Sequence, residues 1–382
     1  MKETIFHLNI ASIAHYHSCT GTVFLHSLLD DHPEIISIPG VPNLMNLFKK
    51  KYSSASEALE KFLNDNPCFF DTALFKPEMP NTAGLWCLGK NKSDHIVTDQ
   101  KLFEDFFYSH IKNQNINPKT IIISIYYAYA KAHGVDLSRS KCILFHPHEK
   151  GNAILFHKFF PESKYIIPVR NPIRTYCSII SNVRRKSKFE GFNYIPSGQL
   201  IQNALDLRSF HNIGMKMYIF KFERFGDKSE SLMKEVANYL DINFSHSLLK
   251  STFGGYQYWG ANPEKLSSIY DKKRHTNLIS LKKLDLLILN SINKEFSKMM
   301  DYKIMNISPL EKLLVPLIIM FPLEDERKFF LQSLRKILKI QIFLNLIKFC
   351  IKYFPNRIKL LYIYFSNKFS AHYEFLKKNT ST

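Results

Sequence analysis

The sequence predicts an α/β fold, a parallel sheet flanked by helices, with a helical extension towards its C-terminal end. Two segments carry this prediction, residues 5–33 and 164–183, because each reads as a short apolar strand, a polar turn and a helix with one apolar face. A turn of this kind aims backbone N–H groups and the positive end of a helix at an anion. Two such turns in one chain favour a ligand that carries phosphate groups at two places.

The first segment begins with an apolar run over residues 5–14, which is short enough for a buried strand. Residues 18–22 follow as a turn of small residues, in which Gly21 permits backbone angles that other residues avoid and lets a phosphate come close. Thr20 and Thr22 have hydroxyl groups that can bind the phosphate and cap the next helix. A capped turn without a ligand is the alternative. The turn is not a Walker A loop, because it lacks the glycine pair and the Lys-Ser/Thr ending.

The second segment has an arginine at the end of a strand. The β-branched run Tyr165–Val169 predicts a buried strand, and Arg170 follows it directly. Ligands of open α/β sheets collect at this edge, and a guanidinium fork matches the oxygens of a phosphate. Pro172 suits the first turn of the next helix, in which Ser178 can complete the phosphate shell with its hydroxyl. Solvation of both the arginine and the serine is the alternative interpretation.

Histidines are the main candidates for proton transfer. A strand predicted at residues 143–145 ends in His146 and His148, and an imidazole can accept a proton near pH 7. Histidines that only cap or fill the core are the alternative for each position.

A zinc site is a weaker interpretation. His15, His17 and Cys19 alternate along the chain, as His146 and His148 do, and these residue types bind zinc. Their spacing is not that of a common structural zinc site. No metal is therefore expected.

These segments resemble the sulfotransferases that use 3′-phosphoadenosine 5′-phosphosulfate (PAPS), and in particular the bacterial and carbohydrate members of that family. The run Thr20–Leu25 is similar to the family's loop for the 5′-phosphosulfate, and Arg170-Asn171-Pro172 with Ser178 is similar to its motif for the 3′-phosphate. Residues 217–225 resemble a strand that normally reads Tyr-Glu-Asp/Arg-Leu. Residues 252–260 resemble the glycine and tryptophan segment that folds over the nucleotide. The likeness covers about residues 4 to 300, in the family's order.

The resemblance implies a sulfotransferase fold with a P-loop-like sheet, PAPS as a co-substrate without a metal, and transfer of a sulfuryl group to a hydroxyl of a carbohydrate. The residues that it assigns to the nucleotide are Ser18, Cys19, Thr20, Gly21, Thr22, Val23, Arg170, Ser178, Tyr218, Gly254 and Gly255. The residues that it assigns to catalysis are His146, His148 and His17. Glu34 is a third candidate for a general base, because some carbohydrate members of the family use a Glu near the first helix.

The first loop departs from the family pattern at one position. Cys19 stands where the family has a Lys or Arg that stabilises charge on the sulfuryl group, and a protonated His17 or His15 can supply that charge instead. A non-catalytic protein that binds nucleotides or glycans on the same fold is therefore an alternative. Another transferase of the P-loop type is a second alternative, but a kinase needs a loop lysine and carboxylates for Mg²⁺ that the sequence does not show.

The composition favours anionic partners. The 382 residues include 52 Lys and Arg against 33 Asp and Glu, which gives a net charge of +19 and suits a nucleotide, a polyanionic acceptor or a membrane surface. No nucleic-acid partner is expected, because the aromatic and basic residues are not interleaved as in a recognisable module. Six scattered cysteines and the lack of an apolar signal segment favour a cytoplasmic location, with the inner face of the membrane as a second location. Nothing in the sequence indicates the oligomeric state.

The chain is expected to contain a nucleotide-binding domain over residues 1–304 and a basic amphipathic helical extension over residues 305–382. Within the first part, helices are predicted at residues 120–133 and 229–240. The loop over residues 187–198 is expected to cover the site.

The extension is predicted to begin where acidic residues become scarce. Residues 328–354 read as an amphipathic helix that Pro355 interrupts. No apolar run reaches the ~18 residues that a membrane span needs. The extension is therefore expected either to cap the domain or to lie on an anionic membrane surface.

Overall fold

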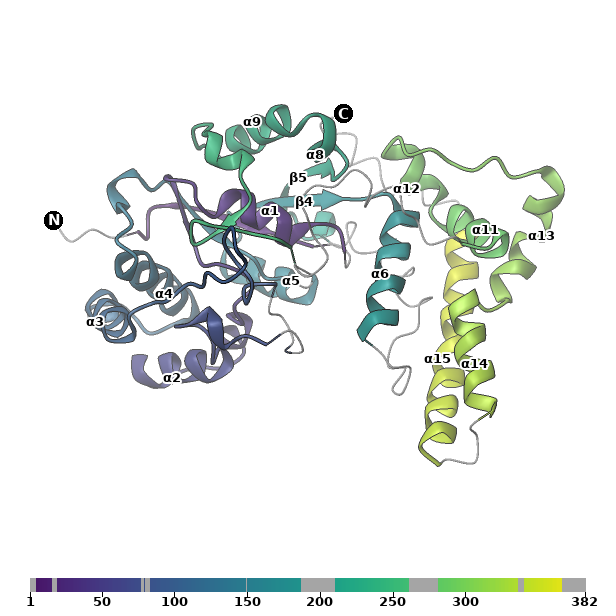
Figure 1. Cartoon of the computed structure of the whole chain (residues 1–382), viewed down its shortest axis with the longest axis horizontal. Coiled ribbons are helices and arrows are strands. Elements are labelled where there is room, and N and C mark those ends of the chain that lie inside the picture. The colour runs from purple at the N-terminus through teal and green to yellow at the C-terminus, as the bar shows by residue number, and fades with distance from the viewer. Residues whose placement is uncertain are drawn as a thin grey trace. The chain divides into compact units, whose positions relative to one another are not determined.

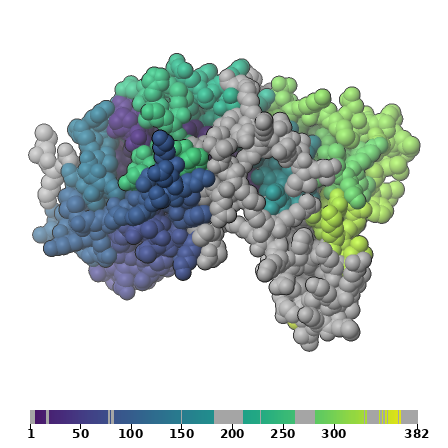
Figure 2. All heavy atoms as spheres, viewed as in Figure 1, coloured from purple at the N-terminus to yellow at the C-terminus, as the bar shows by residue number. Residues whose placement is uncertain are grey.

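The computed structural model describes residues 5–15, 19–76, 79, 83–148, 150–186, 210–260, 281–335 and 340–365 (Figures 1 and 2). The chain forms two compact units. The first consists of Met1–His15, Gly21–Pro168 and Gly214–Lys272, and the second of Tyr16–Thr20, Val169–Ile213 and Lys273–Thr382. The predicted boundary after residue 304 lies within the second unit and stays a prediction, and the predicted covering loop at residues 187–198 lies outside the described residues.

A five-stranded sheet in the order β2-β3-β1-β4-β5 organises the first unit. Its strands are β1 (Asn9–Ile13), β2 (Ile35–Ser37), β3 (Cys142–Phe145), β4 (Lys164–Val169) and β5 (Lys216–Lys221). The pairs β2–β3, β3–β1 and β1–β4 are parallel. The predicted α/β fold with a parallel sheet flanked by helices is thereby confirmed.

The remaining elements of the first unit are mostly helices (Figure 1). They are α1 (Thr22–Leu29), α2 (Ala55–Asp65), α3 (Gln100–Ile111), α4 (Pro118–Ala132), α5 (Lys150–Phe159), α8 (Arg224–Asp227), α9 (Ser229–Leu240), four short 3₁₀ helices at 45–48, 72–74, 137–139 and 246–249, and a hairpin of β6 (Thr252–Phe253) and β7 (Tyr256–Gln257). The helices predicted at residues 120–133 and 229–240 are confirmed as α4 and α9. The reason for α4 is local, since Asn117 and Thr120 form a capping box before the apolar run.

Helices cover both faces of the sheet. Ala11 and Ile13, alternate residues of β1, belong to a buried apolar cluster with residues of α1 and α9. On the other face, the ring of Phe145 in β3 lies 4.5 Å from that of Tyr126 in α4 and 4.8 Å from that of Phe156 in α5. The residues that follow the carboxyl ends of β1 and β3 are thus held on a rigid, buried support.

The second unit is helical in its described part. Its helices are α6 (Pro172–Lys186), α11 (Lys283–Ile292), α12 (Lys294–Met299), α13 (Pro309–Met320), α14 (Glu324–Arg335) and α15 (Ile340–Phe365). Among the helices that the structure describes, none combines the length and the apolarity that crossing a bilayer requires.

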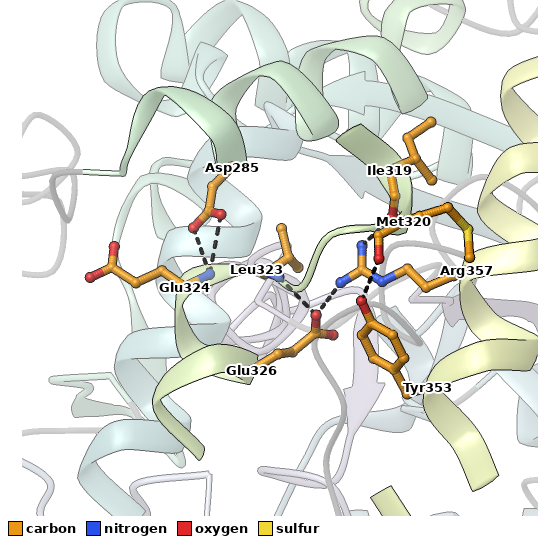
Figure 3. A network of polar contacts seen from close by, with 8 residues as sticks. All are labelled: Asp285, Ile319, Met320, Leu323, Glu324, Glu326, Tyr353 and Arg357. Atoms are coloured by element: carbon orange, nitrogen blue, oxygen red, sulfur yellow. Dashed lines mark hydrogen bonds and ion pairs between the residues drawn. The ribbon is translucent and has the colours of Figure 1, made fainter. Parts of the chain in front are cut away.

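A buried polar network joins three of these helices (Figure 3). The side chains of Arg357 in α15 and Glu326 in α14 are fully buried and form an ion pair. The same guanidinium donates to the carbonyl of Ile319 at 3.0 Å, and the hydroxyl of Tyr353 donates to the carbonyl of Met320 at 2.7 Å. Carbonyls in the last turn of a helix have no intrahelical partner, so α15 completes the hydrogen bonding of α13.

The start of α14 is capped by the neighbouring α11. Both carboxylate oxygens of Asp285 accept the backbone N–H of Glu324 at 3.2 Å (Figure 3). Burial raises the pKa of Asp285 to about 6, although this hydrogen bond lowers it again in part. A carboxylate at a helix N-terminus is stabilised by the helix dipole, which explains why a buried acid is tolerated here.

The prediction that Pro355 interrupts the helix is wrong, because α15 continues through this residue. A proline leaves the carbonyl four residues earlier, that of Ile351, without its helical partner. Both residues are exposed, so water can satisfy this carbonyl. The helix predicted over residues 328–354 is divided between α14 and α15, and residues 336–339 lie outside the described part.

Candidate functional site

The turn after β1 leads into α1 as predicted, but the residue that caps the N-terminus of α1 is not the predicted one. The N-cap residue is Gly21 at φ +92°, without a side-chain cap, so the predicted capping by Thr20 or Thr22 is wrong. A Cβ atom on Gly21 would lie 2.1 Å from a ring carbon of Phe222, just after β5. Glycine is therefore required here by both the backbone angle and the close ring. Of the predicted loop residues, His17 and Ser18 lie outside the described part.

Arg170 lies against the first loop. Its Nη1 donates to the carbonyl of Cys19 at 3.1 Å, within the second unit. Cys19 itself has a left-handed backbone at φ +64°. The guanidinium thus brings positive charge to the loop position at which the resembling family has a Lys or Arg of its own.

The predicted strand–turn–helix around Arg170 is confirmed by β4 and α6. The side chain of Asn171 caps α6, because its Oδ1 accepts the N–H groups of Ile173 at 3.0 Å and Arg174 at 3.2 Å. Ser178 lies two turns into α6 and is half-buried. Its predicted contact with a 3′-phosphate stays a prediction.

Val23 and Tyr218, two further predicted nucleotide residues, have structural contacts. Val23 packs against a buried apolar cluster that includes Phe253. The hydroxyl of Tyr218 donates to Glu235 at 2.5 Å, and Arg224 binds the same carboxylate through two bonds of 2.9 and 2.6 Å. These contacts anchor β5 to α9, and the nucleotide role of either residue stays a prediction.

Gly254 and Gly255 form the turn between β6 and β7, with φ angles of +57° and +78°. A Cβ atom on Gly254 would lie 2.7 Å from the side chain of Ile96. The N–H of Gly254 donates to Oδ2 of Asp30, the residue that ends α1, at 2.6 Å. The turn is therefore tied to the first helix, although its contact with a nucleotide is untested.

His146 is a buried member of a histidine cluster at the carboxyl ends of β1 and β3. Its Nδ1 lies 3.2 Å from Nδ1 of His26 in α1, and its ring centroid lies 5.4 Å from that of His148. The ring of His148 in turn lies 4.9 Å from that of His15, two residues after β1. Nε2 of His146 has no hydrogen-bond partner among the described residues. The two histidines predicted as bases are thus brought together, with His146 more deeply buried.

A chain of hydrogen bonds continues from this cluster through the first unit. Nε2 of His26 lies 2.8 Å from Oγ of Ser37, at the end of β2. The hydroxyl of Ser37 donates to Oδ1 of Asp30 at 3.3 Å. Together with the bond from Gly254, this chain links α1, β2, β3 and the β6–β7 turn.

Burial controls the charge of these groups. It lowers the pKa of His26 to about 3, partly offset by a backbone carbonyl. It also lowers the pKa of His146 well below its usual value, and the neighbouring imidazoles lower that pKa further. Burial raises the pKa of Asp30 to about 7, partly offset by its two hydrogen bonds. Both histidines are therefore neutral at pH 7, whereas Asp30 can change its charge there.

Glu34, the third candidate for a base, is held by other residues. Its carboxylate accepts the backbone N–H and the side-chain amide of Asn243, both at 2.7 Å, and pairs with Lys141 at 2.8 Å. Burial opposes its ionisation, but these contacts outweigh burial and keep the pKa of Glu34 below its usual value. This environment favours a structural role that joins β2 to the segment after α9.

Metal ligands are not assembled in the described part of the chain. No group of three or more His, Cys, Asp or Glu residues there is placed to hold a metal ion. The histidines and the cysteine that suggested zinc include His17, which lies outside that part.

An apolar cavity of about 400 Å³ lies in the first unit. It begins directly after β2 and reaches Tyr129 in α4. Its lining is formed by Ile38, Pro39, Val41, Pro42, Asn43, Asp65, Asn66, Pro67, Cys68, Phe69, Thr72, Phe75, Met79, Leu85, Ile96 and Tyr129. A cavity of this volume with a mostly apolar wall and a few polar groups is typical of a small-molecule site.

His26, Ser37 and Asp30 were not singled out from the sequence. His26 lies among leucines on the apolar face of α1 and reads as a core residue. A weak signal existed, because His26 and Asp30 are four residues apart and so share one side of the helix. Only the fold brings Ser37 beside both.

No protein-family model matches the chain, and no curated protein matches it. Among solved structures, the chain is similar to the sulfotransferase domain from the curacin biosynthetic pathway, with a TM-score of 0.45 and 13% identity over 78% of this chain and 99% of that chain. It is also similar to the sulfotransferase domain from the Synechococcus PCC 7002 olefin synthase, with a TM-score of 0.37 and 10% identity over 72% of this chain and 94% of that chain. Likeness at these identities concerns the fold alone.

Proposed function

We propose that the chain transfers a sulfuryl group from PAPS to a hydroxyl acceptor. One observation carries this proposal, namely that three of the segments that resemble the sulfotransferase family follow the carboxyl ends of neighbouring strands. The loop with Gly21 follows β1, His146 follows β3 and Arg170 follows β4. Open α/β sheets bind their ligands at this edge. Sulfuryl transfer requires hydrogen-bond donors that bind the anionic groups there, and a group that accepts the proton of the acceptor.

The described residues have separate roles in this reaction. The loop from Cys19 to Val23 binds the 5′-phosphosulfate with backbone N–H groups at the start of α1. Arg170 and Ser178 bind the 3′-phosphate, and the contact of Arg170 with the loop carbonyl supports a share in charge stabilisation as well. His146 removes the proton of the acceptor hydroxyl through Nε2.

The cavity favours an acceptor whose body is apolar. Its wall is mainly aliphatic and aromatic, and it begins at the end of β2, the strand beside the one that leads to His146. The carbohydrate predicted from the sequence is the alternative acceptor. Parallel assays with a long-chain alcohol and with an oligosaccharide distinguish the two.

Calorimetric titration with 3′-phosphoadenosine 5′-phosphate tests the nucleotide assignment. We expect micromolar affinity, and a loss of about 10- to 100-fold in Arg170→Ala, because a charge-assisted bond to phosphate is removed. Arg174→Ala is the matched control, since it removes an arginine four residues later, in the helix α6 that follows Arg170. Equal affinity for ATP, or no binding of the bisphosphate, would contradict PAPS use. Binding without PAPS turnover would identify a non-catalytic binder instead.

We also propose that α13 and α15 rest on an anionic membrane surface. Exposed apolar side chains cover both helices; they are Leu310, Leu313, Leu314, Leu317 and Phe321 at α13, and Leu344, Ile347, Ile351, Phe354, Ile358, Tyr362 and Phe365 on α15. In Figure 2 the light-green atoms of the α13 region lie at the surface. Residues 305–382 contain 13 Lys and Arg against 5 Asp and Glu. Apolar surface combined with positive charge suits anionic lipid.

Sedimentation with lipid vesicles tests this contact. We expect the chain to bind phosphatidylglycerol vesicles at least about tenfold more strongly than phosphatidylcholine vesicles, and Leu313→Ser with Ile351→Ser to abolish the difference. Leu74→Ser with Val97→Ser is the control pair, because these residues are also apolar and more than half exposed but lie in the first unit. Equal binding to both vesicles, or self-association that the first pair abolishes, would contradict a membrane role.

A further inference from the structure

The hydrogen-bond chain behind His146 determines where its protons lie, because every link needs one donor and one acceptor. The N–H of Gly254 can only donate, and an ionised Asp30 can only accept. Ser37 has one hydroxyl proton and gives it to Asp30. Ser37 must therefore accept a proton from Nε2 of His26. In a neutral imidazole this leaves Nδ1 of His26 without a proton, so that it can only accept a hydrogen bond.

The same logic reaches His146. Because Nδ1 of His26 has no proton, Nδ1 of His146 must carry the proton in the 3.2 Å contact between these two atoms. Neutral His146 then has its lone pair on Nε2. This is the buried atom that has no partner among the described residues. A lone pair on a positioned nitrogen is what a general base requires.

A proton on Asp30 reverses every link. Protonated Asp30 donates to Ser37, Ser37 donates to Nε2 of His26, and Nδ1 of His26 donates to Nδ1 of His146. Nε2 of His146 then carries the proton. The two arrangements differ by one proton, and they contain the same heavy-atom contacts.

We propose that His26, Ser37 and Asp30 form a relay that carries the acceptor's proton from His146 to Asp30. The proposal rests on the proposed sulfuryl transfer, which supplies that proton. As the acceptor oxygen bonds to sulfur, the bond between sulfur and the 5′-phosphate oxygen of PAPS breaks and 3′-phosphoadenosine 5′-phosphate leaves. The proton of the acceptor passes to Nε2 of His146, and the proton on Nδ1 of His146 passes to Nδ1 of His26. The proton on Nε2 of His26 passes to Ser37, whose own proton passes to Oδ1 of Asp30. One proton leaves the acceptor, and one is gained by the carboxylate.

The environment of the relay agrees with this direction. Burial disfavours an imidazolium at either histidine, whereas Asp30 has a pKa of about 7 and can hold a proton near neutral pH. The residue as a whole is half-buried, although its carboxyl is buried, and each turnover requires that Asp30 then passes the proton to solvent. The relay therefore removes the proton without leaving a positive charge in the core.

The pH dependence follows from the charge of Asp30. Below about pH 7 the carboxyl of Asp30 is already protonated and cannot accept a further proton from Ser37. The rate of transfer is therefore expected to fall as the pH falls through that value. The titratable groups that face Asp30 are Asp31 and Tyr129, and those that face His146 are His26, His148 and His15. Asp31 raises the pKa of Asp30, in the same direction as burial.

Asp30→Asn provides a decisive test, because the N–H of Gly254 obliges the amide oxygen to face it. The amide NH₂ then faces Ser37 and donates to it, which locks the chain in the reversed arrangement. We expect ¹⁵N NMR to show His146 protonated on Nδ1 in the wild type and on Nε2 in the variant. The turnover number is expected to fall about 10²- to 10⁴-fold and the acid limb near pH 7 to disappear, with unchanged affinity for the bisphosphate.

Asp31→Asn is the control for turnover, since it removes a neighbouring, exposed carboxylate that lies outside the hydrogen-bond chain. It should retain turnover above pH 7 and move the acid limb to lower pH, because Asp31 raises the pKa of Asp30. Wild-type protein with His146 protonated on Nε2, or full turnover in Asp30→Asn, would overturn the relay. Wild-type protein that shows the expected tautomers but turns over no PAPS with any acceptor would overturn the proposed function instead. If Asp30→Asn does not fold, Ser37→Ala breaks the same chain, and an unchanged rate in that variant overturns the relay.

Discussion

Replacing His146 with alanine is expected to lower the rate of sulfuryl transfer about 10²- to 10⁴-fold, the range by which a general base contributes. The imidazole stays neutral at pH 7 because burial lowers its pKa, so it is available as a base. Binding of 3′-phosphoadenosine 5′-phosphate should be unchanged, because His146 accepts a proton and does not bind phosphate in this scheme. Initial rates with PAPS, measured beside calorimetric affinity, check both statements.

His148→Ala is the companion variant, since sequence spacing alone does not separate the two histidines. The ring of His148 contacts that of His146, but it is the latter that ends the hydrogen-bond chain through His26. We therefore expect His148→Ala to retain more activity than His146→Ala. The reverse order would assign the base to His148 and remove the role of the chain behind His146. His157→Ala, at the far end of α5, controls for the loss of an imidazole.

Replacing Arg357 with leucine is expected to destabilise the second unit by about 3–5 kcal/mol. Its guanidinium and the carboxylate of Glu326 are fully buried together, and removing one partner leaves the other as an uncompensated buried charge. The carbonyl of Ile319 also loses its donor. Urea unfolding of the full chain, followed by a probe in α13 or α15, measures the change.

Lys359→Leu is the matched control, because it removes an exposed positive charge from the same helix two residues later. Its effect on the free energy of unfolding is expected to stay within about 0.5 kcal/mol. Replacing Glu326 and Arg357 together by leucine should recover part of the loss, since no lone charge then remains. A small effect of Arg357→Leu alone would mean that water reaches the pair in solution.

The strands β1, β3 and β4 and the helices α1, α4, α6 and α9 could be predicted because their signals are local. Tyr165–Val169 is an apolar β-branched run, and Asn117 with Pro118 marks the start of α4. The wrong prediction at Pro355 has the same origin, because the rule that a proline interrupts a helix considers only the local sequence. The fold keeps α15 continuous through the buried bonds of Tyr353 and Arg357 on either side of the proline.

The role of Gly21 shows how local and distant causes combine. Its sequence context predicted a turn that a phosphate can approach, and the positive φ angle agrees with a turn. The ring of Phe222, about two hundred residues later, is an independent reason for glycine at this position. No pattern within one segment could indicate that contact.

The sequence by itself determined the α/β class, the strand–turn–helix segments and the histidines and arginine at the strand ends. These follow from hydrophobic period and turn chemistry within a few residues. Only the tertiary structure decided that Arg170 meets the Cys19 carbonyl and that His146 is connected through His26 and Ser37 to Asp30. Such contacts join residues far apart in the chain, and packing rather than local propensity brings them within hydrogen-bond distance.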